Sequence, residues 1–191
     1  MARLSANNLV TAQAIIARYP KPRSALVPLC HLAQEQDGYL TQDAMGHIAE
    51  LIGCTPAEVY GTASFYEMFK LHPVGTYLVG VCTNISCMLN GAYELLDHCQ
   101  ASLGVSVGGT TSDGMFTLEE VECSAACTIA PAVQVNYRYE GNVTPQAFDD
   151  LVSKLRSGQR PDIPRHGVLA TVRQDVTDKW ADSGHSEVHS G

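Results

Sequence analysis

The chain has 191 residues, of which 45% are hydrophobic and 17% are charged, so it is long enough to bury a core and has a globular composition. Its formal net charge is −8 with no block of lysine or arginine, which argues against a nucleic-acid-binding surface. We find no signal peptide and no apolar run near the roughly 20 residues of a transmembrane helix, so we expect no direct membrane insertion.

Four amphipathic helices are predicted in the first part of the chain. Apolar residues recur at helical spacing from Leu9 to Tyr19, and a second helix ends near residues 37–38. Thr41 caps a third helix that closes at Gly53. A fourth begins at residues 55–58, a capping box with proline at the first helical position, and runs to about residue 66. These helices predict a small N-terminal bundle over residues 1–73.

Two features of this bundle have alternative interpretations. The first 34 residues carry basic residues but no acid before Glu35, a bias that occurs in organellar transit peptides. The apolar spacing of this segment continues into the later helices, which favours a native first helix. Phe65, Tyr66, Met68 and Phe69 could form a docking patch. We expect them instead to be a core stripe that joins the bundle to the next domain.

Strands and helices alternate over residues 74–157. Residues 77–81 and 115–122 are predicted strands, and each leads into a pair of cysteines. A helix carries Ala92, Leu95, Leu96 and Cys99, residues 132–137 form another strand, and a last helix begins at residues 144–145. This order predicts a compact α/β layer whose cysteines lie on loops at the ends of strands.

The residues after 157 lose this periodicity. Residues 158–191 contain Pro161, Pro164 and a closing run of serine, glycine and histidine, so we expect a flexible tail, extended or disordered in isolation. His185 and His189 are spaced four residues apart, but a solvated pair is the simpler interpretation than a metal site.

Four cysteines arrive as two close pairs, Cys82 with Cys87 and Cys123 with Cys127. Thiolates are the ligands that iron-sulfur clusters and zinc prefer, and two nearby cysteines can face one metal without backbone strain. The pattern therefore predicts a four-cysteine metal site held by two loops. Spacing alone leaves a [2Fe-2S] cluster and structural zinc at roughly even odds.

Other sulfur chemistry fits the sequence less well. A thioredoxin-type redox centre needs Cys-x-x-Cys, a Rieske centre needs two histidine ligands, and a disulfide framework expects a short secreted chain with an even number of cysteines. None of these patterns is present. Cys30 and Cys99 lie on apolar helix faces and are expected to be buried hydrophobic residues, whereas Cys54, at a helix end, is expected to be a packing residue of the core or near the surface.

Longer motifs surround the cysteines and resemble a known family, that of the peripheral [2Fe-2S] subunit of NADH-quinone oxidoreductase, which is respiratory complex I. The resemblance covers roughly residues 10–155 and includes a long Phe-Thr-Leu-Glu-Glu-Val-Glu-Cys run. The matching segments are Gly61–Phe69 with Pro73–Gly75, Val81–Asn84, Cys87–Gly91, Asp113–Cys123 and Ala126–Pro131.

The resemblance implies an N-terminal helical region followed by a thioredoxin-like [2Fe-2S] ferredoxin domain. It implies that Cys82, Cys87, Cys123 and Cys127 are the cluster ligands. Two positions depart from the family pattern: Ser86 stands where proline is common, and Ala125 stands where glycine is common. Neither removes a ligand, although alanine adopts positive φ less easily than glycine, so this loop is expected to turn differently or present a different amide.

The resemblance also implies the partners. NADH and FMN would bind a neighbouring flavoprotein subunit among other peripheral-arm subunits of complex I, on the cytoplasmic side of the inner membrane. This agrees with the sequence, which contains no Gly-x-Gly fingerprint and no phosphate-binding loop. A diaphorase subunit of an NAD-dependent formate dehydrogenase or hydrogenase is the nearest alternative. A zinc-stapled interaction module and a thiol enzyme are alternatives of other classes.

Overall fold

The structure is a computed structural model that describes residues 3–168; the tail from residue 169, with His185 and His189, lies outside the described residues. The described part is a mixed α/β fold with seven α-helices and one four-stranded sheet. The helices are α1 (Ala6–Ile16), α2 (Leu26–Asp37), α3 (Gln42–Ile52), α4 (Pro56–Phe65), α5 (Ile85–Leu89), α6 (Ala92–Leu103) and α7 (Pro145–Arg156). The strands are β1 (Tyr77–Cys82), β2 (Phe116–Val121), β3 (Val133–Val135) and β4 (Arg138–Glu140), and two short 3₁₀ helices are η1 (Pro22–Ala25) and η2 (Cys127–Ile129).

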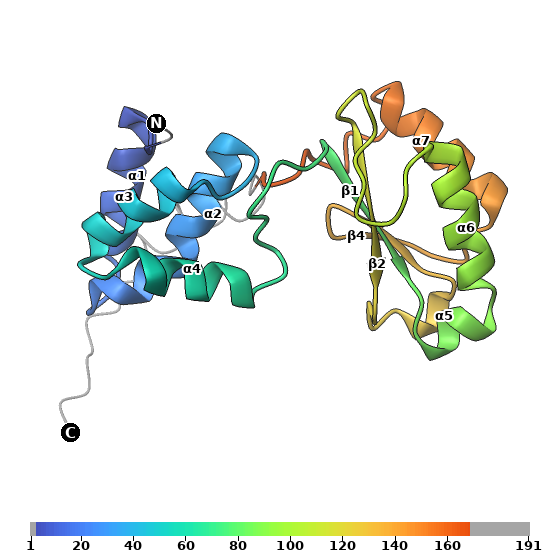
Figure 1. Cartoon of the computed structure of the whole chain (residues 1–191), viewed down its shortest axis with the longest axis horizontal. Helices are drawn as coiled ribbons and strands as arrows, with labels where there is room; N and C mark the ends of the chain where they lie inside the picture. The colour runs from blue at the N-terminus through green and yellow to red at the C-terminus, as the bar shows by residue number, and fades with distance from the viewer. Residues whose placement is uncertain (1–2, 169–191) are drawn as a thin grey trace, which may run out of the picture.

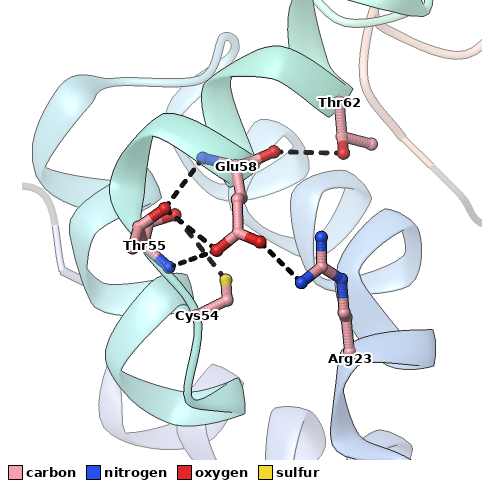
Figure 2. Close-up of polar contacts among 5 residues, drawn as sticks. All are labelled: Arg23, Cys54, Thr55, Glu58 and Thr62. Atoms are coloured by element: carbon pink, nitrogen blue, oxygen red, sulfur yellow. Dashed lines mark hydrogen bonds and ion pairs between the residues drawn. The ribbon is translucent and has the colours of Figure 1, made fainter.

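The predicted capping box at the start of α4 is confirmed (Figure 2). Thr55 Oγ1 accepts a hydrogen bond from the Glu58 amide at 3.3 Å, and Glu58 Oε2 accepts one from the Thr55 amide at 2.9 Å. The second carboxylate oxygen pairs with Arg23 Nη1 at 2.6 Å, which ties η1 to α4. The Thr55 amide, followed by the Thr55 hydroxyl and Arg23, lowers the pKa of Glu58 to about 2.

The helices α1 to α4 share one apolar core. Only part of the predicted aromatic and methionine stripe is buried in it. Phe69 is buried in this core and Met68 packs against it. Phe65 is 80% exposed and Tyr66 is 40% exposed, so the expectation of a continuous core stripe was wrong for these two rings. The reason is that α4 ends at Phe65, so the helical periodicity does not extend across the stripe. Tyr19, three residues beyond the end of α1, is exposed for the same reason.

The sheet has the strand order β2-β1-β3-β4. The strands β1 and β2 are parallel, with Val79 opposite Leu118, whereas β3 is antiparallel to both of its neighbours. The helices α6 and α7 cover the face of the sheet that is turned away from α1–α4 (Figure 1). Phe116 and Phe148 are fully buried between these layers.

Two local predictions in the sheet domain are corrected. The single strand expected over residues 132–137 is a hairpin of β3 and β4, because Asn136 and Tyr137 both adopt positive φ (47° and 64°) and reverse the chain. The Asn136 side chain stabilises this turn: its oxygen accepts from the Leu78 amide at 2.8 Å and its nitrogen donates to the Thr76 carbonyl at 3.0 Å. A short helix, α5, was not expected within the first cysteine pair.

Polar contacts link the helices to the sheet. Lys70, in the connection after α4, is largely buried and its Nζ pairs with Glu119 Oε1 of β2 at 2.7 Å. The buried side chain of Gln34 in α2 holds the same connection, because it donates to the Met68 carbonyl and accepts from the Lys70 amide, both at 2.8 Å. Gly75 then donates to Thr117 Oγ1 at 2.7 Å, which positions the start of β1 beside β2.

Residues 159–168 form a strap that packs against the sheet domain and, at Gly167, lies beside Gln34 of α2, which corrects the expectation of a flexible tail for these residues. Arg160 pairs with Glu140 at 2.5 Å, and Ile163 is buried in the core of the sheet domain. Farther along, the His166 amide donates to the Thr76 carbonyl at 2.8 Å. The correction has a physical cause, because one apolar side chain and a few polar contacts fix the strap without the periodicity of a helix or strand. The strap crosses between the two parts in Figure 1.

Candidate metal centre

The parallel pairing of β1 and β2 brings the two cysteine pairs together. Parallel strands end at the same edge of a sheet, and each pair lies at or just after such an end. Cys82 is the last residue of β1 and stands opposite Val121, the last residue of β2. Cys123 follows Val121 by two residues. The fold therefore delivers both pairs to one edge of the sheet.

All four predicted site cysteines line one cavity of about 90 Å³. Asn84, Ile85 and Ser86 line it from the first loop, and Ala126 lines it from the second. No histidine, aspartate or glutamate lines this cavity, and within residues 3–168 no three such side chains or cysteines are grouped closely enough to bind a single ion. A [2Fe-2S] cluster asks for two thiolates on each iron, so the donor set suits a cluster held between the two pairs.

Cys82 and Cys87 are buried, at 4% and 2% exposure, and belong to regular elements. The Cys87 amide donates to the Asn84 carbonyl at 2.8 Å, and Asn84 is the N-cap of α5. A five-residue helix thus turns the second cysteine inward from a chain that has just left β1. Thr83 Oγ1, beside Cys82, donates to Glu120 Oε1 at 2.7 Å and fixes this loop to β2.

The two buried thiols have different electrostatic surroundings. Burial acts to raise the pKa of Cys82, but hydrogen bonds from the backbone amides of Ser124 and Asn84 and from neighbouring side chains lower the pKa below its ordinary value. Burial raises the pKa of Cys87, and the Ala132 amide offsets this only in part. Several backbone N–H groups therefore point at these sulfurs, as a bound anionic cluster requires.

Cys123 and Cys127 are exposed and lie on a loop that ends in η2. Between them Ala125 adopts φ 54°, the left-handed conformation that glycine adopts easily, so alanine does not prevent a sharp turn here. The Ala125 amide donates to Cys123 Sγ at 3.4 Å. The turn therefore directs an amide at a sulfur of its own pair.

Small side chains, rather than the large apolar ones, enclose the buried side of the cavity. Ala92 and Ala132 form a cluster with Cys82 and Cys87, and two partly buried alanines pack against it. Ile85, which lines the cavity, and Met88 in the same short helix are 65% and 43% exposed. These two large apolar side chains therefore remain largely in contact with solvent.

The remaining cysteines lie elsewhere in the core, as expected. Cys30 and Cys99 are fully buried, and burial raises the pKa of each thiol to about 12, so both are neutral packing groups. Cys54 is half-buried and donates to the Thr55 carbonyl at 3.7 Å.

Sequence reasoning missed two residues at the site. The Ala132 amide reaches Cys87 from the start of β3, and no local pattern signals this long-range contact. Ser124 is buried, and its backbone amide is directed at Cys82 of the other loop. The position of Ser124 between the candidate ligands Cys123 and Cys127 was the one signal in the sequence that could have identified it.

Comparison with known proteins gives consistent matches. Residues 12–156 match the family model described as thioredoxin-like [2Fe-2S] ferredoxin. A subunit of the NADH-quinone oxidoreductase of Mycobacterium tuberculosis (strain ATCC 25618 / H37Rv) is 48% identical over 166 residues, which cover 86% of this chain and 66% of that protein. A subunit of the NADH-quinone oxidoreductase of Rhizobium meliloti (strain 1021) is 40% identical over 148 residues, covering 78% of this chain and 88% of that protein.

The chain spans about two thirds of the length of the mycobacterial relative that it matches. Among solved structures, an NAD⁺-reducing [NiFe]-hydrogenase in the air-oxidized state matches 72% of this chain and 24% of its own chain, with a TM-score of 0.64 and 23% identity. At this identity the likeness concerns the fold.

Proposed function

The chain belongs to the thioredoxin-like [2Fe-2S] ferredoxin family, and from that membership we propose that it is the [2Fe-2S] electron-transfer subunit of an NADH-quinone oxidoreductase. The observation that carries the proposal is the cavity of about 90 Å³ that four thiols from two loops line together. Relatives named as subunits of NADH-quinone oxidoreductase, at 40% and 48% identity, support the choice of complex.

We propose that Cys82, Cys87, Cys123 and Cys127 hold the cluster. When bound, a [2Fe-2S] cluster accepts and releases one electron at a time. The buried pair fixes one side of the site from β1 and α5, and backbone amides directed at the sulfurs stabilise negative charge there. The exposed pair leaves the other side at the molecular surface, where a partner's redox group can approach.

The partner in this proposal is a flavoprotein subunit that binds NADH and FMN. NADH gives up two electrons as a hydride, and this sequence contains no dinucleotide fingerprint with which to bind it. The purified chain alone should therefore not oxidise NADH. A groove of about 350 Å³, lined by Glu67, Glu120, Glu122 and Cys123, flanks the exposed side of the site.

We further propose that residues 1–73, with their four helices, and residues 74–157 are separate structural units. The apolar core of α1–α4 and the core of the sheet domain share no residue, and the links described between the two are mostly polar. Among residues 3–168 no helix is both long and apolar enough to cross a membrane. Our proposal places the chain on the cytoplasmic side of the inner membrane, within the peripheral arm of complex I.

Anaerobic purification of the full chain tests this function. We expect a reddish-brown protein with equal amounts of iron and inorganic sulfide and a paramagnetic signal after one-electron reduction. A colourless protein that binds zinc, or a metal-free protein with reactive thiols, would contradict the proposal. Co-purifying subunits decide the complex: quinone-reducing subunits support it, whereas molybdenum or nickel subunits would favour a formate dehydrogenase or a hydrogenase.

A further inference from the structure

A second cavity lies where the helical part, the sheet domain and the strap meet. Its volume is about 290 Å³, and its walls come from α2, the connection after α4, the turn between β3 and β4, and the strap. That turn lies beside the start of β1, because the Asn136 side chain accepts from the Leu78 amide, whereas Cys82 ends the same strand. At about 3.3 Å per residue, Leu78 and Cys82 are roughly 13 Å apart, so this cavity is distinct from the one that the thiols line.

Basic side chains line this cavity, and no aspartate or glutamate of residues 3–168 does. Arg138 of β4 and Arg165 of the strap are exposed, and neither side chain makes an ion pair or a hydrogen bond within the described part of the chain. The nearby Asp162 is already held by two hydrogen bonds from Arg160. Two guanidinium groups without a fixed partner therefore lie at one cavity, in a chain whose net charge is −8.

His166 is the buried member of the cavity wall. It is 8% exposed, and its amide is fixed to the Thr76 carbonyl at 2.8 Å. Neither ring nitrogen has a hydrogen-bond partner among residues 3–168, although the residue lines the cavity. An imidazole gives up its hydrogen bonds to water on burial, so an unpaired one in a native protein calls for a partner that the protein atoms do not supply. An anionic group in the cavity is an acceptor of the kind that this ring lacks.

The rest of the wall suits the body of a ligand. Met68, Pro164 and Val168 give the cavity an apolar side. The side-chain amides of Gln34 and Asn136 also line it, but both are engaged with backbone groups at 2.8–3.0 Å. The volume is at the lower end of ligand pockets, which measure roughly 300–1,000 Å³, so the cavity has room for a compact small molecule.

We propose that this cavity binds a small organic anion, a carboxylate or a phosphate ester, whose charged group lies between Arg138 and Arg165 and whose apolar body lies against the apolar side. A guanidinium group presents its N–H groups in a planar fork that matches the oxygens of either anion, and such charge-assisted hydrogen bonds are about twice as strong as neutral ones. The anion also removes the repulsion between the two arginines, so it holds the strap to β4. The site requires neither the cluster nor its ligands.

Calorimetric titration of the full chain with phenyl phosphate, which joins a phosphate to an apolar ring, tests this site. We expect one phenyl phosphate per chain, bound about tenfold more tightly than inorganic phosphate at the same ionic strength, because only the ester fills the apolar side. Arg138→Gln and Arg165→Gln should each weaken binding about tenfold, since each removes a charge-assisted contact. Arg18→Gln is the matched control: Arg18 is exposed and lies outside the cavity, so the affinity should stay that of the wild type.

Two further measurements separate the cavity from the protein surface. Val168→Trp places a large side chain at the cavity wall and keeps both arginines, so it should abolish binding. In the wild type, phenyl phosphate at ten times its Kd should slow hydrogen exchange of the His166 amide about tenfold, because opening of the strap releases the ligand.

Absence of binding at millimolar phenyl phosphate would overturn the inference, as would unchanged affinity in both arginine variants or in Val168→Trp. Equal affinity for inorganic and phenyl phosphate would show an adventitious ion only, and an equal loss in Arg18→Gln would show a general effect of charge. The titration reads affinity in iron-free and iron-loaded protein alike, so a chain that binds no iron would refute the proposed function and leave this test intact.

Discussion

The two cysteine loops reach the same cavity by different means. The first pair is buried and built on regular structure, with Cys82 in β1 and Cys87 in α5. The second pair is exposed, on a loop that turns through a left-handed alanine. The difference teaches that the fold itself prepares one half of the proposed metal site, whereas the other half lies at the surface on a strained turn.

This asymmetry suits an electron carrier. A rigid, partly dehydrated half limits the rearrangement that accompanies a change of charge, and backbone amides supply fixed dipoles. The exposed half keeps one edge of the site at the surface, where electrons can pass to a partner. The following experiments test this division of roles.

The largest expected effect comes from removing a ligand in either loop. Cys82→Ser and Cys123→Ser should both lose or severely perturb the cluster, because each pair supplies thiolates that the site needs. Iron analysis and the absorption spectrum measure the loss. Cys99→Ser is the control: it places a hydroxyl in the core, should cost about 1–3 kcal/mol of stability in urea, and should keep the iron. Equal iron loss in all three variants would show that the ligand assignment is wrong.

In the protein without its cluster, the amides of the two loops should exchange their hydrogens at different rates. In the iron-free protein the Cys87 amide keeps its bond to the Asn84 carbonyl, whereas the Ala125 amide has only the sulfur of Cys123 as acceptor. We expect the Cys87 amide to exchange about a hundredfold more slowly, which corresponds to about 2.7 kcal/mol of local stability. Mass spectrometry or NMR of the chelator-treated protein measures this ratio, and equal protection would mean that the cluster organises both loops alike.

Thr83→Val tests how the first loop is fixed to the sheet. The change removes the hydroxyl that donates to Glu120 at 2.7 Å and keeps the shape of the side chain. Because Glu120 is exposed and can bind water instead, we expect a loss of only about 1 kcal/mol in urea unfolding, with the cluster retained. A loss of several kcal/mol would mean that this contact carries far more of the loop's stability than its exposure suggests.

The smallest expected effect is at the strained turn. Ala125→Gly relieves a left-handed conformation that costs an L-residue roughly 1–2 kcal/mol, and it adds unfolded-state freedom worth about 0.4–1 kcal/mol. The net expectation is a gain of about 0.5 kcal/mol in stability. Ala126→Gly is the matched control, because Ala126 has φ −111° and gains no relief, so it should lose stability. A loss in both variants would show that position 125 carries no strain.

The comparison of the loops also marks what the sequence could predict. The strands before each cysteine pair, the capping box at Thr55 and the burial of Cys30 and Cys99 were predicted, because each depends on residues close in the chain. The same patterns could not show that β1 and β2 pair in parallel, which is what gathers the four cysteines.

The failures share a cause. The turn at Asn136 depends on a side chain that bonds to residues 58–60 positions away, and the strap depends on Ile163 entering a core built from other segments. Exposure of Phe65 depends on where α4 stops. Contacts between distant segments leave no periodic trace in the sequence.

The strap has a consequence for how the molecule is made. Translation proceeds from the N-terminus, so all four cysteines leave the ribosome before residues 159–168 do. The contacts of Arg160, Ile163 and His166 with the sheet domain therefore form only at a late step of synthesis. A nascent chain thus presents all four candidate ligands before the contacts of the strap can form.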